Sequence, residues 1–554
     1  MKNLEKKHYI IIGIWLLINL LQAIFTGLHS DESYYWMYSQ NLDWGYFDHP
    51  PMVALFIYLG QIILPGEIGV RIIIVLFSTL TFALILNELN ERKDFFFVSL
   101  FILSFPLIHT HISGFLAIPD NPLLLFVLLF LLLYKKFLEK AGWLNSVLLG
   151  IVIAAMIYSK YHAFLVIGFT LLSNLKLFKN KFFYLVVLVS VILVFPHAMW
   201  QIDNDFPTFK YHLIERAKPF QLSYILPYLA GILLVTGPLS GILIFWKLRN
   251  VKIHNQFQRA LIFNLIGFIA LFFIMSFKNR IEIHWLAAII PMIMILSYPL
   301  IKDDIKIKKW FVRLATPVVV LLLLFRIYLA LDIIPNVGNL KITFYNRESN
   351  ALQIKELAQG KKVGFFNNYA AISNYMFYTG DSAVYLSTPD YRFCQYNLWN
   401  YEQFAEGDQI LAIQSKHMDP PNLTRMTTGE MKGYIIIEDF QTLKELDISL
   451  NKISETQNDF IIDLALVNNN PFPIYTDHIS QPVLVISQNN HEILTYPLSE
   501  LVESRILQSI EKTSILLTVP KNVVYKKLPL LIYSKTKENI RGEVLLIKKN
   551  GLVN

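Results

Sequence analysis

The sequence DESYYW (Asp31–Trp36), followed by GYFDHPP (Gly45–Pro51), decides how the first part of this chain folds. Directly before it, an apolar run from about residue 9 to 28 follows three lysines within the first seven residues. That run resembles a signal peptide, but it is too long and lacks a clear small-residue cleavage site. We therefore expect a retained membrane-spanning helix that places carboxylates and aromatic rings just outside the membrane.

The rest of the N-terminal part repeats this apolar character. The chain of 554 residues is 54% hydrophobic, its mean hydropathy is +0.45, and it has a series of apolar runs about as long as a membrane is thick. This excludes an ordinary soluble core as the main architecture. We predict a polytopic α-helical membrane protein with about eleven transmembrane helices, near residues 9–28, 70–89, 95–113, 117–134, 144–158, 162–178, 182–200, 223–246, 258–277, 283–301 and 310–331.

The lysines and arginines predict the orientation, because short cytoplasmic loops carry an excess of both. Alternate loops, beginning with the N-terminus, are rich in them, whereas residues 28–70 contain none. The N-terminus is therefore expected in the cytoplasm, and an odd number of spans places everything after about residue 332 outside. Membrane orientation then accounts for the pI of about 9.1, so the basic charge gives no support for nucleic-acid binding.

Composition changes near Asp332, where long apolar runs give way to short alternating segments separated by polar turns. We expect a membrane domain over residues 1–331 and an extracytoplasmic α/β domain over 332–415, with strands at Lys362–Phe366 and Ala383–Leu386. Residues 416–554 read as a β-rich region with the pattern of a β-sandwich. The lone Cys394 excludes an internal disulfide framework and a cysteine-based metal site.

The two adjacent carboxylates, Asp31 and Glu32, are the first candidates for chemistry. Asp31 stands where the chain leaves the first span and can take a proton from an attacking hydroxyl, or it can simply cap the helix expected over residues 32–40. Neighbouring side chains on a helix point about 100° apart. We therefore expect Glu32 to have a different role: it orients the site, binds a hydroxyl, or is only a solvated charge at the interface.

A second polar cluster, Asp48-His49, precedes Pro50-Pro51, which stiffen the chain. His49 can meet an anionic phosphate, but the two residues can equally form a structural pair. Tyr34 and Tyr35 supply aromatic surface beside Asp31, which suits either a sugar or the membrane interface.

These motifs, taken together and in order, resemble the bacterial glycosyltransferase family 39-like enzymes. That family belongs to the protein mannosyltransferase and lipid A aminoarabinose transferase superfamily, which has the GT-C fold. The resemblance spans about residues 8–405, and the motifs that carry it beyond the first two are PDNP (119–122), SKY (159–161), PHAMW (196–200), HWLA (284–287) and QYNLW (395–399).

The resemblance implies a transferase that takes a sugar from a polyprenyl-phosphate donor on the outer face of a bacterial plasma (inner) membrane. It passes the sugar, with inversion, to a hydroxyl or phosphate of a glycan, lipid or protein acceptor. Asp31 matches the proposed catalytic aspartate of the family. His49 stands at or beside the position where some relatives use a lysine near the phosphate, so the resemblance does not fix its role.

Other polar residues lie at the expected outer ends of spans. A charge near the membrane interior is costly in free energy, so such a residue tends to be functional or to have an oppositely charged partner. Lys160 is the best candidate cation for the donor phosphate. Alternatively, its long side chain only extends the ammonium group to the membrane interface, where it has no role in binding. Asp120 can bind sugar hydroxyls or cap a helix. The alternatives to Lys160 are Lys278, Arg280 and Arg71, of which the two arginines are the more plausible bidentate phosphate clamps. The resemblance favours a substrate-binding role for all of these and for Tyr161, His284, Trp285, Gln395 and Tyr396.

A divalent cation is left open, because the candidate ligands show no spacing that fixes a geometry. The main alternative function is a transporter or flippase for a lipid-linked or anionic solute, which should carry ionisable groups near mid-membrane. A third is a surface scaffold or sugar-binding receptor that works through the β-rich tail. It would leave the polar residues 31–49 unexplained.

Overall fold

The computed structural model describes residues 4–89, 91, 93–109, 114–212, 220–331, 346–388, 391–414, 422–426, 431–488, 491–523, 530–536 and 541–547. The chain forms two compact units, Met1–Tyr345 and Asn346–Asn554. The boundary expected near residue 332 falls in 332–345, outside the described residues. Each unit is described by itself.

The first unit is helical, as expected for a polytopic membrane protein. By length and composition, seven helical segments of its described part can cross a membrane, and each coincides with an expected span. They are α1 (Lys6–Phe25), α4 (Gly66–Leu89), α7 (Asp120–Glu139), α10 (Lys181–Asp203), α14 (Gln256–Met275), η4 with α15 (Ile283–Ile289 and Ile290–Lys302) and α16 (Ile305–Ala330).

The other expected spans are shorter or broken. The run 223–246 forms η3 (Leu222–Tyr224) with α12 (Ile225–Thr236) and then α13 (Ser240–Leu248), bent by 93°. The bend lies at Gly237, whose φ of +98° disfavours a side chain. The run 95–113 forms α5 (Phe95–Leu103) and the short α6 (Pro106–His109), because a helix ends most easily before proline. The total of about eleven spans stays a prediction.

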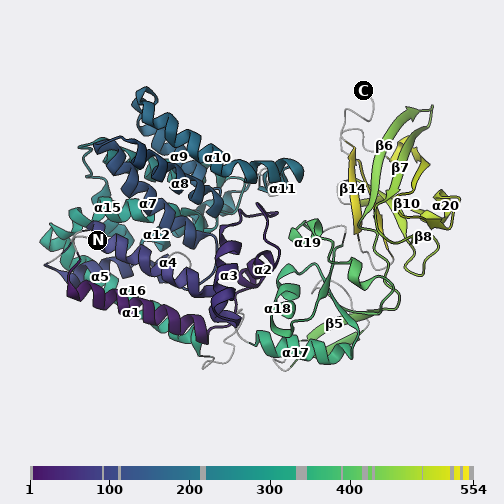
Figure 1. The fold of residues 1–554 in the computed structure, drawn as a ribbon, viewed down its shortest axis with the longest axis horizontal. Helices are drawn as coiled ribbons and strands as arrows, with labels where there is room; N and C mark the ends of the chain where they lie inside the picture. Colours follow the sequence, from purple (N-terminus) through teal and green to yellow (C-terminus); the bar gives the residue numbers. More distant parts are fainter. Residues whose placement is uncertain are drawn as a thin grey trace. The chain divides into compact units, whose positions relative to one another are not determined.

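Shorter helices complete the first unit. Within residues 28–70 the sequence indicated only a helix over about residues 32–40, which α2 matches; it did not indicate the apolar α3, which packs on α4. The remaining elements are α2 (Ser30–Gln40), α3 (Met52–Ile63), α8 (Trp143–Ser159), α9 (Ala163–Ser173), η1 (Leu175–Lys179) and α11 (Pro207–Lys210). Figure 1 shows α8, α9 and α10 side by side.

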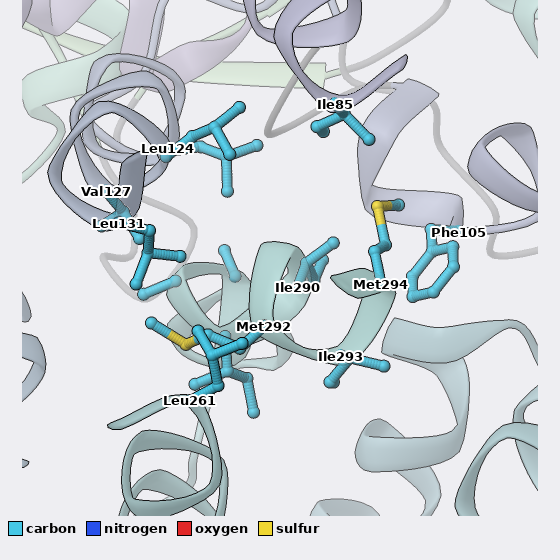
Figure 2. Close-up of a cluster of buried hydrophobic side chains, with 14 of the residues drawn as sticks. Ile85, Phe105, Leu124, Val127, Leu131, Leu261, Ile290, Met292, Ile293 and Met294 are labelled. Carbon is cyan, nitrogen blue, oxygen red and sulfur yellow. The ribbon is translucent and has the colours of Figure 1, made fainter. Parts of the chain in front are cut away.

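The core of the bundle forms where apolar faces of helices meet. Leu124, Val127 and Leu131 recur at helical spacing on one face of α7, and they point toward the chain at Ile290 and Met292 (Figure 2). All five side chains are buried. This contact fixes the start of α15 against α7 and so fixes the polar residues that precede both helices.

Two ends of the bundle can be told apart by their contacts. The end of α1 meets the start of α4 through Arg71 and Ala23, and the start of α7 meets the end of α8 through Asp120 and Lys160. We call this the site end. The opposite end, where α4 and α7 finish, carries most of the lysines and is called the lysine end.

The second unit begins with an α/β sheet. Its five strands lie in the order β2-β1-β3-β5-β4; β1 pairs in parallel with β2 and β3, whereas β5 is antiparallel to β3 and β4. The elements are α17 (Arg347–Ala358), β1 (Lys362–Phe366), α18 (Tyr369–Thr379), β2 (Ala383–Leu386), α19 (Gln395–Leu398), η5 (Gln403–Ala405), β3 (Ile410–Ile413), β4 (Asn422–Arg425) and β5 (Met431–Ile437).

The rest of the second unit is strand-rich. Two antiparallel sheets, β12-β7-β6 and β10-β9-β13-β14, share one hydrophobic core, as in a sandwich. The α/β sheet continues to Ile437, so the expected boundary at residue 415 falls inside it. The elements are β6 (Leu446–Glu455), β7 (Asp459–Asn468), β8 (Ile474–Tyr475), β9 (Val483–Gln488), β10 (His491–Pro497), α20 (Leu498–Leu501), β11 (Ile506–Leu507), β12 (Lys512–Pro520), η6 (Lys521–Val523), β13 (Leu530–Lys535) and β14 (Arg541–Ile547).

Candidate functional site

The first turn of α2 is held by a reciprocal cap. The Nδ1 atom of His29 accepts a hydrogen bond from the Asp31 amide at 3.2 Å, and the amide of His29 donates to Glu32 Oε2 at 2.8 Å. The N-cap is therefore His29, and Asp31 does not have the capping role that was one alternative. The Asp31 side chain is 41% exposed, and its Oδ2 lies 3.7 Å from His29 Nδ1. Asp31 thus presents a carboxylate to the surface from a fixed helical turn.

Glu32 points the other way, into the protein, and pairs with Arg71. Arg71 Nε donates to Oε1 at 2.7 Å and Nη2 donates to Oε2 at 2.5 Å, and both side chains are fully buried. The amide of Ala117 also donates to Oε1 at 2.8 Å. Burial by itself would raise the pKa of Glu32, but the Arg71 charge and these hydrogen bonds hold that pKa below its usual value.

Arg71 has used all of its donors. Besides Glu32, its guanidinium donates to the carbonyls of Ala23, Thr26 and Gly27. A guanidinium has five N–H groups, and these contacts account for all five. The structure therefore corrects one sequence-based assignment, because Arg71 has no donor left with which to clamp a phosphate. For Glu32, the geometry favours the orienting role over a solvated charge.

The aromatic residues of α2 pack inward. Tyr34 and Tyr35 are both buried, and the ring of Tyr34 lies 4.7 Å from that of Tyr38. Tyr38 stacks on Tyr46 at 4.0 Å, which ties α2 to the following loop. These rings therefore shape the site from behind, and the expected sugar-stacking surface is not provided by Tyr34.

Asp48 and His49 form a partnered pair beneath α2. The hydroxyl of Tyr38 donates to Asp48 Oδ1 at 2.6 Å, the same oxygen lies 3.3 Å from His49 Nδ1, and Tyr35 Oη lies 3.3 Å from His49 Nε2. Burial and the nearby Asp48 charge raise the pKa of Tyr38 well above its usual value, so it remains a donor. The geometry thus favours the structural reading of this pair that the sequence left open.

A second group of polar residues gathers at the starts of α7 and η4 and the end of α8. Lys160 Nζ donates to Asp120 Oδ1 at 2.7 Å, and both side chains are buried. His162 and His284 lie within electrostatic reach of Asp120, and the Trp285 ring lies 5.6 Å from that of His162. Four of the expected residues are therefore brought together, and His162 joins them.

Tyr161 links this group to the loop after α2. Its hydroxyl lies 3.1 Å from His197 Nε2 and accepts a hydrogen bond from Gln201 at 2.9 Å. Thr208 donates to the carbonyl of Tyr46 at 3.2 Å, and His197 Nδ1 lies 2.6 Å from the carbonyl of Trp44. The end of α10 and the start of α11 therefore hold the loop that carries Asp48.

Sequence reasoning missed several of these connecting residues. His197 was quoted only as part of a motif, and His162 and His212 were not named as candidates. His212 Nε2 lies 3.3 Å from the carbonyl of Asp48 and is within electrostatic reach of His162. The sequence did offer one indication of these histidines. They stand near the site ends of apolar segments, where a polar residue is costly in free energy.

The four remaining expected residues are Lys278, Arg280, Gln395 and Tyr396. Lys278 and Arg280 are exposed beyond the end of α14, and Arg280 Nε lies 3.7 Å from Glu282. Gln395 and Tyr396 belong to the second unit, where both are buried and the Tyr396 hydroxyl lies 2.7 Å from Ser373 Oγ. Tyr396 also stacks on Tyr385, so the second unit uses this motif for packing and not as an open binding surface.

The described residues contain no group of three or more His, Cys, Asp or Glu side chains arranged to hold a metal ion. Whether a divalent cation takes part stays open.

One family model and two solved structures are similar to this chain. A family model described as dolichyl-phosphate-mannose-protein mannosyltransferase matches residues 48–200, a stretch that contains Arg71, Asp120 and Lys160. The crystal structure of ArnT from Cupriavidus metallidurans in the apo state is 14% identical with a TM-score of 0.54, and the match covers 74% of this chain and 92% of that one. The first unit has the GT-C fold.

A second ArnT structure, bound to undecaprenyl phosphate, gives the same GT-C likeness. It is 13% identical with a TM-score of 0.55, and the match covers 78% of this chain and 98% of that chain. No curated protein matches the chain. The GT-C fold that the motifs indicated is thereby confirmed. Asp31 precedes the matched residues 48–200, so its assignment rests on the motif and on the geometry of α2.

Proposed function

We propose that this chain is an inverting glycosyltransferase that moves a sugar from a polyprenyl-phosphate donor to a hydroxyl or phosphate of an acceptor. One observation carries the proposal. Through Glu32, the first turn of α2 is bonded to the amide of Ala117, three residues before Asp120. An exposed carboxylate, Asp31, is therefore fixed at the same end of the bundle as the buried cation Lys160.

These two groups suit a direct displacement. The Asp31 carboxylate accepts the proton of the acceptor hydroxyl as its oxygen forms a bond to the anomeric carbon. The bond from that carbon to the phosphate oxygen breaks, and the electron pair leaves with the polyprenyl phosphate. One displacement inverts the anomeric carbon and needs no second carboxylate as nucleophile. Lys160, near His162 and His284, supplies positive charge for the departing phosphate.

The donor class is supported by likeness in fold to ArnT, which was crystallised with undecaprenyl phosphate. Transfer at the outer face of a bacterial plasma membrane is supported by the lysine pattern, which puts the site end outside. The same pattern places the N-terminus in the cytoplasm and the second unit outside. The proposed acceptor is a glycan, a lipid or a protein, and the second unit is the part of the chain available to recognise it.

The test is a comparison of cells that contain equal membrane amounts of the wild-type protein and of Asp31→Asn. Mass spectrometry of envelope lipids, glycans and secreted proteins should show a sugar adduct that disappears with Asp31→Asn, while its polyprenyl-phosphate donor accumulates. Loss of a general base slows transfer by about 10²- to 10⁴-fold. Unchanged glycans together with an altered solute distribution would support the transporter instead.

A matched control is Asp205→Asn. Asp205 is also a carboxylate at the site end, but its side chain is 83% exposed and pairs only with Lys210 among the described residues. Its replacement should leave the adduct unchanged. An equal loss of the adduct in both variants would assign the effect to general surface charge and remove Asp31 from the base role.

A further inference from the structure

A cavity of about 210 Å³ lies between α7, α8, α9 and α10, apart from the candidate site. Its walls include Phe137, Leu149, Leu177 and Val186, and η1 closes it toward the lysine end. It reaches the surface of the bundle, because the lining residue Val191 is 60% exposed. These four elements belong to the part of the chain that is apolar enough to lie in a membrane.

The polar groups in the cavity wall are already bonded within the protein. The hydroxyl of Ser190 donates to the carbonyl of Val186 at 2.8 Å and lies 3.2 Å from the carbonyl of Gly150, and Thr170 Oγ1 accepts a hydrogen bond from Asn264. A wall of this kind offers little to water and suits an apolar ligand. An apolar cavity of about 150 Å³ is large enough for benzene, so this larger one holds several carbons of a hydrocarbon chain.

The rim of the cavity at the lysine end is positively charged. Leu177, which lines the cavity, lies in η1 between Lys176 and Lys179, and the lining residue Phe183 follows Lys181 by two positions. All three lysines are exposed. Lys181 also lies 5.4 Å over the ring of Phe182.

These three lysines differ from four others at the same end, which are neutralised by carboxylates. Among the described residues none of Lys176, Lys179 and Lys181 has an ion pair. By contrast, four lysines lie 2.5–3.0 Å from carboxylates: Lys135 with Glu88, Lys247 with Asp304, Lys302 with Glu91 and Lys308 with Asp94. Three uncompensated cations therefore surround the rim of an apolar cavity.

We propose that this is a binding site for an anionic phospholipid. One acyl chain enters the cavity between α7 and α10, and the negatively charged headgroup lies among Lys176, Lys179 and Lys181. The cavity supplies the apolar half of the recognition, and the lysines supply charge complementarity. The site goes beyond the proposed transferase function, because it lies at the opposite end of the bundle from Asp31.

Native mass spectrometry of the purified full chain in detergent tests the proposal, with phosphatidylglycerol as the anionic probe and phosphatidylcholine as the zwitterionic comparison. Wild type should retain phosphatidylglycerol in preference. The triple variant K176Q/K179Q/K181Q should bind it about tenfold more weakly. The control K252Q/K306Q/K309Q removes three exposed lysines of the same end that do not adjoin the cavity, and it should bind phosphatidylglycerol like wild type.

A second pair of variants tests the cavity. Val187 lines it, whereas the next residue, Leu188, does not, and both are exposed on α10. V187F should reduce phosphatidylglycerol binding, and L188F should not. All variants are compared at equal monodispersity and equal thermal unfolding without added lipid, so that a folding defect is not counted as lost binding.

Equal retention of both lipids by wild type, or undiminished binding in both the triple lysine variant and V187F, would overturn the proposal. The readout is lipid binding and not sugar transfer. Neither result therefore bears on the proposed transferase function, which has its own test.

Discussion

Two buried acid–base pairs lie at the site end among the described residues of the first unit, and they are built differently. In the Glu32–Arg71 pair, hydrogen bonds within the protein occupy every guanidinium donor and both carboxylate oxygens. In the Asp120–Lys160 pair, one hydrogen bond joins the two groups. An ammonium has three donors, so among the described contacts Lys160 keeps donors in reserve.

The difference separates structure from function. A closed pair such as Glu32–Arg71 has no bonding capacity for a ligand, so its role is to fix α2 against α1 and the start of α7. In an open pair such as Asp120–Lys160, the buried ammonium group keeps hydrogen-bond donors that the described contacts do not occupy. Such a group suits the binding of a phosphate. The following tests compare ionisable groups by how fully the protein satisfies them.

The largest effect is expected from breaking the closed pair. Arg71→Met leaves the Glu32 carboxylate buried without its cation, which costs about 3–5 kcal/mol of stability. The variant should therefore unfold at a markedly lower temperature in detergent, or fail to accumulate in membranes. Thermal unfolding followed by loss of monodisperse protein gives the measurement.

The double variant Glu32→Gln/Arg71→Met sharpens this test. Removing both charges should restore only part of the lost stability, because the carbonyls of Ala23, Thr26 and Gly27 lose their shared donor. Complete recovery would show that the pair contributes only through its two charges, and the closed description would then be wrong.

The open pair should behave in the opposite way. The double variant Asp120→Asn/Lys160→Gln removes both buried charges, so its thermal unfolding should stay close to that of wild type. Binding of a polyprenyl phosphate should weaken about 10- to 100-fold, the value of a charge-assisted hydrogen bond. Titration of the purified chain with undecaprenyl phosphate measures this loss. Normal binding by the folded double variant would exclude Lys160 from the phosphate site.

This contrast also marks what the sequence can reveal. The motif at residues 31–36 correctly predicted a helix after the first span, and the runs at Lys362–Phe366 and Ala383–Leu386 coincide with β1 and β2. Local patterns decide such elements, since alternation and helix caps are properties of neighbouring residues. The spacing of apolar runs likewise located seven membrane-length helices.

The role of Arg71 could not be predicted in this way. Its function depends on carbonyls that the end of α1 leaves open and on a carboxylate 39 positions away. No local pattern states which carbonyls lack a partner. The boundary at residue 415 was misplaced for a similar reason, because pairing of β5 with β3 is a long-range contact.

A half-buried carboxyl that has no ion pair among the described residues provides the next comparison. Glu406 Oε2 accepts a hydrogen bond from the amide of Thr442 at 3.0 Å. Burial, opposed by this hydrogen bond and reinforced by the charges of Asp439 and Glu402, raises the pKa of Glu406 from 4.5 to about 7. The folded chain therefore holds this proton more tightly than the unfolded chain does.

The sign of the pH dependence follows from that shift. The stability gained from protonated Glu406 is fully present below about pH 4.5 and is lost as pH rises through about 7. Glu406→Gln imitates the protonated form. It should stabilise the chain by about 1–2 kcal/mol at pH 8, less than the full shift implies because part of the side chain meets solvent, and it should have no effect at pH 4.

Thermal unfolding of the full chain at the two pH values measures this difference, and Glu503→Gln, an exposed carboxyl of the same unit, is the control. A stabilisation by Glu406→Gln that is equal at both pH values would mean that the side chain acts through packing and not through its charge.

The smallest effect on stability is expected for an ion pair whose two side chains are both exposed to water. Lys355 Nζ lies 2.8 Å from Asp381 Oδ2, but the two side chains are 46% and 43% exposed. Solvent and salt screen such a pair, so Lys355→Gln should change the free energy of unfolding by less than about 0.5 kcal/mol. Unfolding at low and high salt measures it. A loss comparable with that of Arg71→Met would show that short distance alone decides the strength of an ion pair here. The predicted contrast instead attributes that strength to burial and to the number of donors that the protein satisfies.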